Sequence, residues 1–176
     1  MLKLSRWLAV GMIAAVLTGC GYTLVGTGSY LPEDIKAIYV APLENRTLQP
    51  QVDQILTQAI AEEFVTRQRY EVVNSVDEAD AQLLGAVTGY AVSPVAFDNE
   101  GRATQYEISI TLALRFQRTK GDPPQILWAS DRYVFRKQYE LDVSSATSFF
   151  DPQNLAIEDV AQEFARTLVI DLLEGF

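Results

Sequence analysis

The chain reads YEISITLALRFQ from Tyr106 to Gln117, and this stretch decides the fold. Apolar or aromatic residues occupy every even position, while the odd positions are polar, charged or small. A period of two is typical of a β-strand with one buried and one exposed face. We therefore expect a long strand here, in a sheet that is covered on one side.

Strands are also predicted on both sides of this stretch. Residues 120–124 contain Gly121 and two prolines and predict a turn, after which residues 125–137 return as a strand. Residues 81–92 precede it as a strand weakened by Gly85 and Gly89, which indicate a bulge or a close backbone contact. Residues 93–101 are predicted to form a loop, and we expect Tyr106 and Trp128 to lie in the core.

The first third of the chain predicts a β-α-β unit. Residues 35–40 are apolar and β-branched and predict a strand, residues 42–50 a loop with a turn at Asn45, and residues 70–73 a short strand. Between them, apolar residues recur at spacings of three and four and predict a helix to about Arg67: Val52, Ile55, Leu56, Ala59, Ile60 and Phe64.

A second helix is predicted at the C-terminal end. Asp151 offers a capping carboxylate and Pro152 suits the first helical position, and an apolar stripe then continues to Leu172. The element order is β-α-β-β-β-β-α. The sequence therefore predicts an α+β fold, with a mixed β-sheet of about four main strands and two α-helices packed on one face.

The N-terminus predicts export and lipidation. Lys3 and Arg6 precede an apolar run from Trp7 to Leu17, which suits a signal peptide and is too short to span a bilayer. The run ends in Leu-Thr-Gly-Cys at residues 17–20, which is similar to a bacterial lipobox. Cys20 is the only cysteine, so no intramolecular disulfide can form and lipidation is the expected use of its thiol.

These signals divide the chain into three parts. We expect residues 1–19 to be a signal peptide, residues 20–34 a lipidated tether, and residues 35–176 a single α+β domain. Gly21 stands directly after the cysteine, where aspartate retains many lipoproteins at the inner membrane. The expected location is therefore the periplasmic side of the outer membrane, with the anchor in its lipid.

The composition excludes several classes of function. Histidine is absent, and lipidation of Cys20 would leave no thiol, so the commonest general base, the commonest metal ligand and the thiolate nucleophile are missing. No nucleophile elbow, phosphate loop or calcium loop occurs. The signal contains two basic residues, so the remainder has 12 basic and 23 acidic residues, net −11, which opposes binding to nucleic acid. Carboxylate or serine chemistry remains possible, and no metal or cofactor site is predicted.

The charge is unevenly distributed along the chain. Residues 102–137 contain seven basic and three acidic residues, although the chain as a whole is acidic. Arginine forks suit phosphate, so Arg102, Arg136 and Lys137 are the candidate anion contacts; the alternative is an ordinary solvent-exposed sheet face. Phe97, between Pro94 and Asp98, and Gly101 are the candidate residues of a protein interface.

Four segments resemble the lipopolysaccharide-assembly lipoprotein family LptE. The segments are a lipidated start at Cys20-Gly21-Tyr22-Thr23-Leu24, the stretch Ile38–Thr47, a glycine turn leading into a long alternating strand at Asn99–Ile108, and a closing helix with Ala165, Leu168, Val169 and Leu172. The resemblance covers almost the whole mature chain and rests on the order and spacing of these segments.

The resemblance implies a non-enzymatic outer-membrane lipoprotein that plugs the LptD β-barrel, assists its assembly and supports lipopolysaccharide transport to the cell surface. Basic residues near the tip of the sheet are the family's lipid A contacts. Here Asn99 stands before the Glu-Gly turn, residues 138–150 contain no Lys or Arg, and Arg102 is the nearest substitute.

A second resemblance leaves another function open. The segment from Ile35 to Thr47, the helix after it and residues 78–81 are similar to lipoprotein activators of peptidoglycan synthases and to curli-secretion-like domains. These are also binding or pore-forming modules with a β-α-β start. A carboxylate hydrolase is a third class, but the sequence does not bring a pair of acidic residues together.

Overall fold

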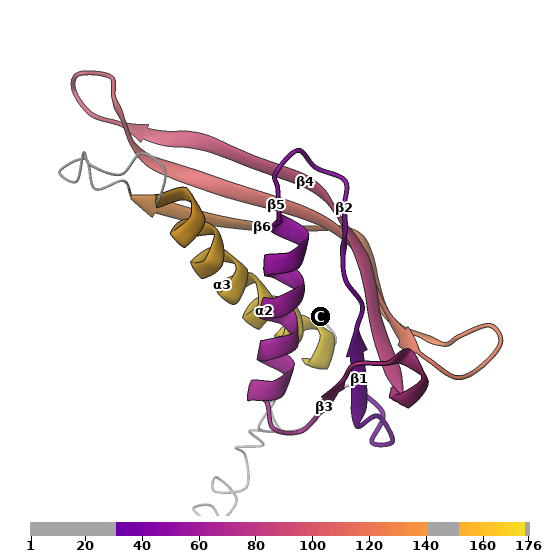
Figure 1. Ribbon diagram of the computed structural model, residues 1–176. Coiled ribbons are helices and arrows are strands. Elements are labelled where there is room, and N and C mark those ends of the chain that lie inside the picture. Colours follow the sequence, from indigo (N-terminus) through magenta and orange to yellow (C-terminus); the bar gives the residue numbers. More distant parts are fainter. Residues whose placement is uncertain (1–30, 141–151, 175–176) are drawn as a thin grey trace, which may run out of the picture.

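The computed structural model describes residues 31–140 and 152–174. In this part of the chain a six-stranded mixed sheet is covered on one face by two helices (Figure 1). The strands are β1 (Ala37–Val40), β2 (Glu44–Asn45), β3 (Glu71–Val73), β4 (Ala81–Phe97), β5 (Ala103–Arg118) and β6 (Ile126–Glu140). The helices are α2 (Val52–Thr66) and α3 (Pro152–Glu174), and a 3₁₀ turn, η1, covers Val76–Glu78.

The strand order is β3-β1-β4-β5-β6, with β2 pairing separately with β4. β1 is parallel to both β3 and β4, whereas β4, β5 and β6 form an antiparallel meander. The predicted α+β class and the element order are confirmed. The sheet has two small strands, β2 and β3, in addition to the four main ones.

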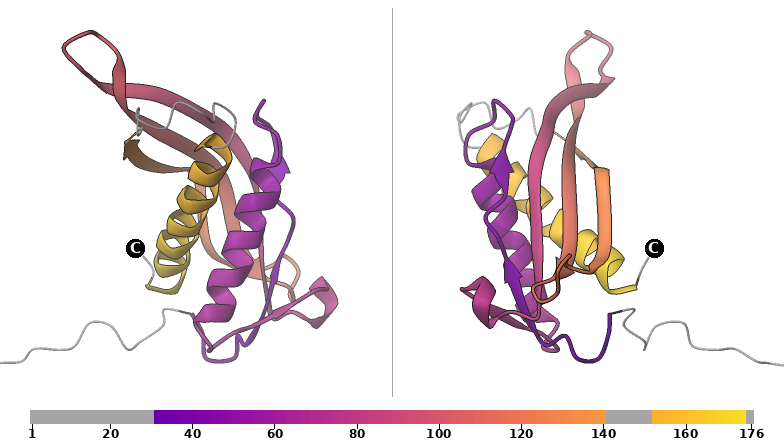
Figure 2. Two further views of the ribbon diagram at one scale, coloured as in Figure 1. Left: turned by 60° about the vertical axis from the view of Figure 1, so that its left-hand side comes forward. Right: turned by 90° about the vertical axis from the view of Figure 1, so that its right-hand side faces the viewer.

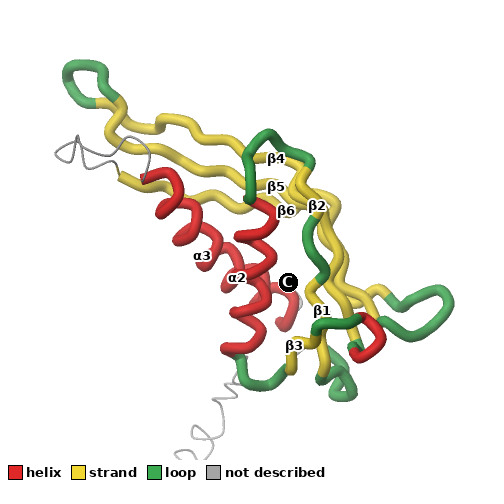
Figure 3. Tube along the Cα trace, in the orientation of Figure 1, coloured by secondary structure: helices red, strands yellow, loops and turns green. Residues whose placement is uncertain are grey.

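The core lies between the sheet and the helices, which lie on the same face in every view (Figures 2 and 3). The even positions of β5 from Ile108 to Phe116 are all buried, as the period of two predicts. Each helix places one apolar stripe on this face, with Phe64 of α2 and Phe164 of α3 fully buried. The hydroxyl of Tyr133 also donates to Asp171 Oδ2 at 2.6 Å and so joins β6 to α3.

Gly85 makes the close backbone contact and Gly89 adjoins the bulge that the sequence predicts for these two glycines. A Cβ atom at Gly85 would lie 2.5 Å from Leu114 Cδ2 and 2.6 Å from the carbonyl oxygen of Ala113, so only glycine permits this approach. The β4–β5 register shifts between Val87 and Gly89, which places a bulge there.

Three predicted boundaries were wrong. Residues 93–97 form the end of β4 instead of a loop, β6 continues to Glu140, and β2 lies inside the predicted loop 42–50. Pro94 favoured a loop, but proline is tolerated at a strand position whose nitrogen faces away from the neighbouring strand. Tyr106 and Trp128 are half-buried at the margin of the core and do not lie within it.

Cys20 and Asp151 lie outside the described residues, as does most of the predicted loop 138–150. Neither α2 nor α3 has the length and apolarity that a membrane-spanning helix requires. The predicted division into signal, tether and domain stays a prediction.

Candidate functional site

The distal part of the β4–β5 hairpin, from Tyr90 to Tyr106, is the candidate functional site. Figure 2 shows this hairpin extending beyond the ends of both helices. Three apolar side chains of β4 are exposed here: Val92 by 42%, Val95 by 43% and Phe97 by 60%. Exposed apolar residues that gather on one projecting element are typical of a surface that binds a partner.

The turn at the tip is organised by one carboxylate. Asp98 Oδ1 accepts from the backbone N–H of Glu100 at 2.9 Å and of Arg102 at 2.8 Å. Asp98 Oδ2 accepts from Arg102 Nε at 2.7 Å, and the second arm of the guanidinium reaches Glu100 at 2.8 Å. Gly101 has a φ of 77°, which glycine adopts without strain. The tip is therefore an ordered turn.

Hydrogen bonding also stabilises the charged form of Asp98. The backbone N–H of Arg102, its guanidinium and the N–H of Glu100 together hold the pKa of Asp98 below its usual value. The hydrogen bond from Arg102 to Asp98 in turn raises the pKa of the guanidinium. At neutral pH both groups are charged, and the turn stays closed around them.

Three tyrosines lie at the base of the distal hairpin. The rings of Tyr106 and Tyr139 stack with centroids 5.9 Å apart and an interplanar angle of 23°. Burial, and next the proximity of Tyr139, raises the pKa of Tyr90, while burial and Tyr106 raise the pKa of Tyr139. Tyr90 and Tyr139 therefore stay neutral at physiological pH, and the three rings form an amphipathic surface next to the core.

The candidate interface and anion residues do not form one cluster. Phe97, Gly101 and Arg102 lie together in or beside the tip turn. Arg136 pairs across the ladder with Ser109 and lies 3.7 Å from Glu107, on the face away from the helices. Lys137 pairs with the buried Ile108 and forms an ion pair with Glu163 of α3, on the helix face.

All three candidate cations are therefore already paired with carboxylates. Arg102 contacts Asp98 and Glu100, Arg136 contacts Glu107, and Lys137 contacts Glu163. An anionic ligand would have to displace or share these carboxylates.

A shallow hollow of about 170 Å³ lies on the uncovered face of the sheet, next to Gly85. It is lined by Leu84, Gly85, Ala113, Leu114, Arg115 and Asp131. Within residues 31–140 and 152–174, no group of three or more acidic, cysteine or histidine side chains is arranged to hold a metal ion.

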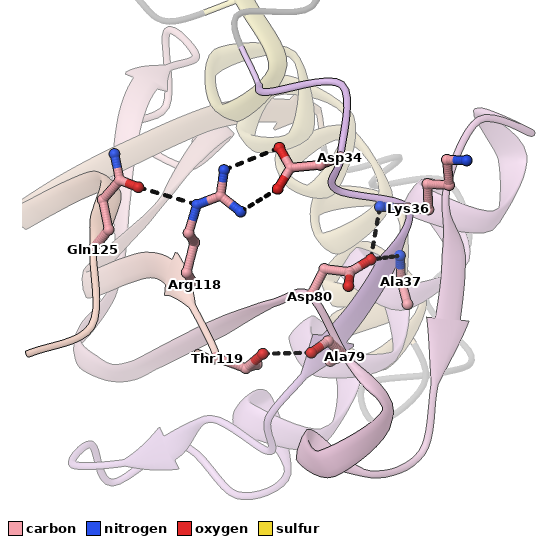
Figure 4. Close-up of polar contacts among 8 residues, drawn as sticks. All are labelled: Asp34, Lys36, Ala37, Ala79, Asp80, Arg118, Thr119 and Gln125. Carbon is pink, nitrogen blue, oxygen red and sulfur yellow. Dashed lines mark hydrogen bonds and ion pairs between the residues drawn. The ribbon is translucent and has the colours of Figure 1, made fainter. Parts of the chain in front are cut away.

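A second polar cluster closes the opposite end of the sheet (Figure 4). Asp80 Oδ2 accepts from the backbone N–H groups of Lys36 and Ala37, both at 3.0 Å. Arg118 holds both carboxylate oxygens of Asp34, at 2.5 and 3.0 Å, and Thr119 donates to the carbonyl of Ala79. We call Asp34, Asp80, Arg118 and Thr119 the basal clamp.

The basal clamp joins three segments that are distant in sequence. The backbone N–H groups of Ala37 and then Lys36 hold the pKa of Asp80 below its usual value, while the side-chain hydrogen bond from Arg118 lowers the pKa of Asp34. The clamp thus fixes the start of β1 against the start of β4 and the end of β5.

Sequence reasoning missed the basal clamp and the exposed Val92 and Val95. The clamp has no local signal, because Asp34 and Arg118 are 84 residues apart. Val92 and Val95 did have a local signal. The stretch that forms β4 contains no charged residue among its 17 positions, which favours a strand over an exposed loop.

Known proteins provide a further comparison. The family model described as LptE, lipopolysaccharide-assembly, matches residues 35–172. No curated protein sequence matches the chain.

Several solved structures share the fold. The hypothetical protein CT253 from Chlamydia trachomatis is 9% identical with a TM-score of 0.55, and the match covers 81% of this chain and 97% of that one. Protein XCC0632 from Xanthomonas campestris is 12% identical with a TM-score of 0.53, covering 85% and 89%. PelC from Paraburkholderia phytofirmans, solved as a dodecamer, is 14% identical with a TM-score of 0.51, covering 83% and 92%. At these identities the likeness concerns the fold alone.

Proposed function

The chain belongs to the lipopolysaccharide-assembly family LptE, and we propose that it plugs the LptD β-barrel, assists its assembly and so supports lipopolysaccharide transport to the cell surface. The family consists of non-enzymatic outer-membrane lipoproteins. The coarse function, lipopolysaccharide assembly, follows from membership. The plug role is a more specific proposal, and the observation that supports it is the family match over residues 35–172.

The shape of the domain supports this role. The long meander of β4, β5 and β6 projects beyond the helices and exposes Val92, Val95 and Phe97 on an ordered hairpin. A stable and specific protein interface buries more than about 1,000 Å². The hairpin together with the uncovered sheet face offers an extended surface for such a contact.

Site-specific photo-crosslinking tests the proposal. A photoreactive residue at Phe97 or Glu100 should capture LptD in intact cells, because both positions lie at the exposed end of the hairpin. Glu100 is preferred to the neighbouring Gly101, whose positive φ strains any other residue. The matched control is Asp122, which is exposed in the β5–β6 turn at the other end of the sheet.

The outcome separates this function from its alternative. Capture of LptD at the hairpin and not at Asp122 supports the plug role. If the hairpin positions capture only a peptidoglycan synthase, the chain is an activator of that enzyme and the plug role is wrong.

Direct contact with lipopolysaccharide is a separate part of the proposal, and it rests on Arg102, Arg136 and Lys137. Arg136 and Lys137 lie on opposite faces and pair with Ser109 and Ile108, which are about 20 Å along the extended chain from Arg102. A single phosphate group would therefore contact only one of the three. Reversing all three charges should weaken lipopolysaccharide binding severalfold at low salt and much less at high salt, since salt screens exposed charges.

Arg67→Glu is the matched control for this experiment. Arg67 is also an exposed arginine paired with a carboxylate, Glu63, but it lies at the end of α2 away from the hairpin. Unchanged binding of the triple variant at low salt would mean that the three cations serve only their internal ion pairs. Loss of the barrel complex instead would assign them to the protein interface.

A further inference from the structure

The outer edge of β4 is paired along only half of its length. Residues 81–83 pair with β1, and Ala86 and Val87 pair with β2. Beyond Val87, no strand in the described part of the chain pairs with this edge, although β4 continues to Phe97 (Figure 1). Among the described residues, the distal half of β4 is therefore an open strand edge.

The ladder determines which backbone groups point out of this edge. The carbonyls of Leu83 and Val87 point outward, because they accept from Ala41 and Arg46 at 3.0 and 2.9 Å. Across the ladder these two residues face even-numbered positions of β5, namely Phe116 and Leu112. Residues that face even positions of β5 therefore direct their N–H and C=O groups outward.

Three residues of the distal half meet this condition. Tyr90, Val92 and Pro94 face Ile110, Ile108 and Tyr106. The position of Pro94 independently supports this assignment. Proline has no backbone N–H, so it fits a position that donates no hydrogen bond to β5. The open edge thus presents two donors, at Tyr90 and Val92, and three acceptors, at Tyr90, Val92 and Pro94.

Only a short stretch of this edge lacks the usual protection against pairing. Proteins block open strand edges with charged residues, proline or bulges. The outer strand at the other side of the meander, β6, carries Asp131, Arg132, Arg136 and Lys137, whereas β4 carries no charged residue. The first bulge of β4 lies between Val87 and Gly89, and the proline and the next bulge come at Pro94 and beyond, so the unprotected stretch is residues 89–93.

Two exposed apolar side chains lie on or near the open edge. Val92 is 42% exposed, and Leu48 is completely exposed on the loop that leaves β2 where the open edge begins. Asn45 braces this loop: its amide donates to the Gln49 carbonyl at 2.8 Å, and its oxygen accepts from the N–H of Thr47 at 2.9 Å. These hydrogen bonds order the loop, so a partner that contacts Leu48 would lose little of its binding free energy to ordering the loop.

From this arrangement we infer that the outer edge of β4, from Gly89 to Pro94, takes up an extended segment of a different polypeptide as an additional strand. A peptide backbone matches the regular alternation of donors and acceptors along the edge, as in proteins that bind a peptide as an added strand. A second copy is disfavoured because each chain without the predicted signal carries a net charge of −11. The occupant is a neutral or basic segment with apolar alternate residues.

Identifying that polypeptide with LptD rests on the proposed function; the mode of binding does not. Val92→Pro tests the mode, because it removes the outward N–H and leaves the bonds between β4 and β5 in place. Val92→Thr is the matched control, since it removes the same apolar side chain but keeps the N–H. We expect Val92→Pro to reduce co-purification of LptD at least tenfold, and Val92→Thr to reduce it less than threefold.

Hydrogen exchange gives a second measurement that does not depend on the partner's identity. The amides of Tyr90 and Val92 should exchange slowly in the lipidated chain extracted with its native partners and rapidly in the same full chain purified alone. The amides of Ala91 and Ser93 face β5 and should be slow in both, which makes them internal controls.

Each outcome decides the inference. Slow exchange at Tyr90 and Val92 in the native extract, together with selective loss in Val92→Pro, supports it. Equal binding by both variants, or rapid exchange at Tyr90 and Val92 in the extract, overturns it even if LptD co-purifies and the proposed function stands. Slow exchange in a homodimer also overturns it, because the occupant would be a second copy.

Discussion

Phe164→Ala should destabilise the domain by about 3–5 kcal/mol, as truncation of a fully buried phenylalanine does. The side chain of Phe164 is completely buried under the sheet. It makes edge-to-face contacts with Tyr133 and Phe135 of β6, with centroids 6.0 and 5.8 Å away. Urea unfolding followed by circular dichroism measures the loss.

Two further variants complete this experiment. Val65→Ala truncates a valine of α2 that is 58% exposed, and it should change the free energy of unfolding by less than about 0.5 kcal/mol. Phe164→Leu keeps much of the volume and provides a reading if the alanine variant does not fold. A loss at Phe164 no larger than at Val65 would show that α3 does not complete the core.

Cys20→Ala should abolish lipid attachment and cleavage at the predicted signal site. This expectation rests on the position of the lipobox-like residues 17–20, which directly follow the apolar run of the predicted signal. Each buried methylene of an acyl chain contributes about 0.8 kcal/mol to membrane affinity, so the variant should lose its anchor in the outer membrane. The uncleaved apolar run should instead keep the variant in the inner-membrane fraction. Mass spectrometry of the N-terminal peptide is the direct measurement.

Thr18→Ser is the control, because it retains a small residue inside the box and should be processed normally. The prediction fails if the wild-type chain carries an unmodified N-terminus at residue 20, or if Cys20→Ala is cleaved and retained at the membrane like the wild type. Either result would assign the apolar run to a signal of another kind.

The elements with a clear hydrophobic period were predictable from sequence. β5 alternates strictly, and α2 and α3 each carry an apolar stripe, so one pattern set both the structure and the buried face. The end of β4 was not predictable in this way. An open strand edge tolerates proline, and Pro94 therefore gives a loop signal inside a strand.

The candidate site was predictable only in part. Phe97 does lie exposed at the tip, where its neighbours Pro94 and Asp98 indicated a surface position. The proposed anion cluster overlooked a rule already used for β5: Arg136 and Lys137 are consecutive in a strand and must point to opposite faces. The ion pairs of these side chains depend on long-range pairing that no local pattern reveals.

The basal clamp has a mechanical consequence if Cys20 carries the predicted lipid anchor. A pull on the N-terminal segment first meets Leu31, which is buried in the core, and then the two bonds between Arg118 and Asp34. The folded domain therefore resists the pull from residue 31 onward. The segment between Cys20 and Leu31 has a maximal length of about 37 Å, at roughly 3.4 Å per residue. Leu31 and the clamp together set how far the domain can lie from the bilayer.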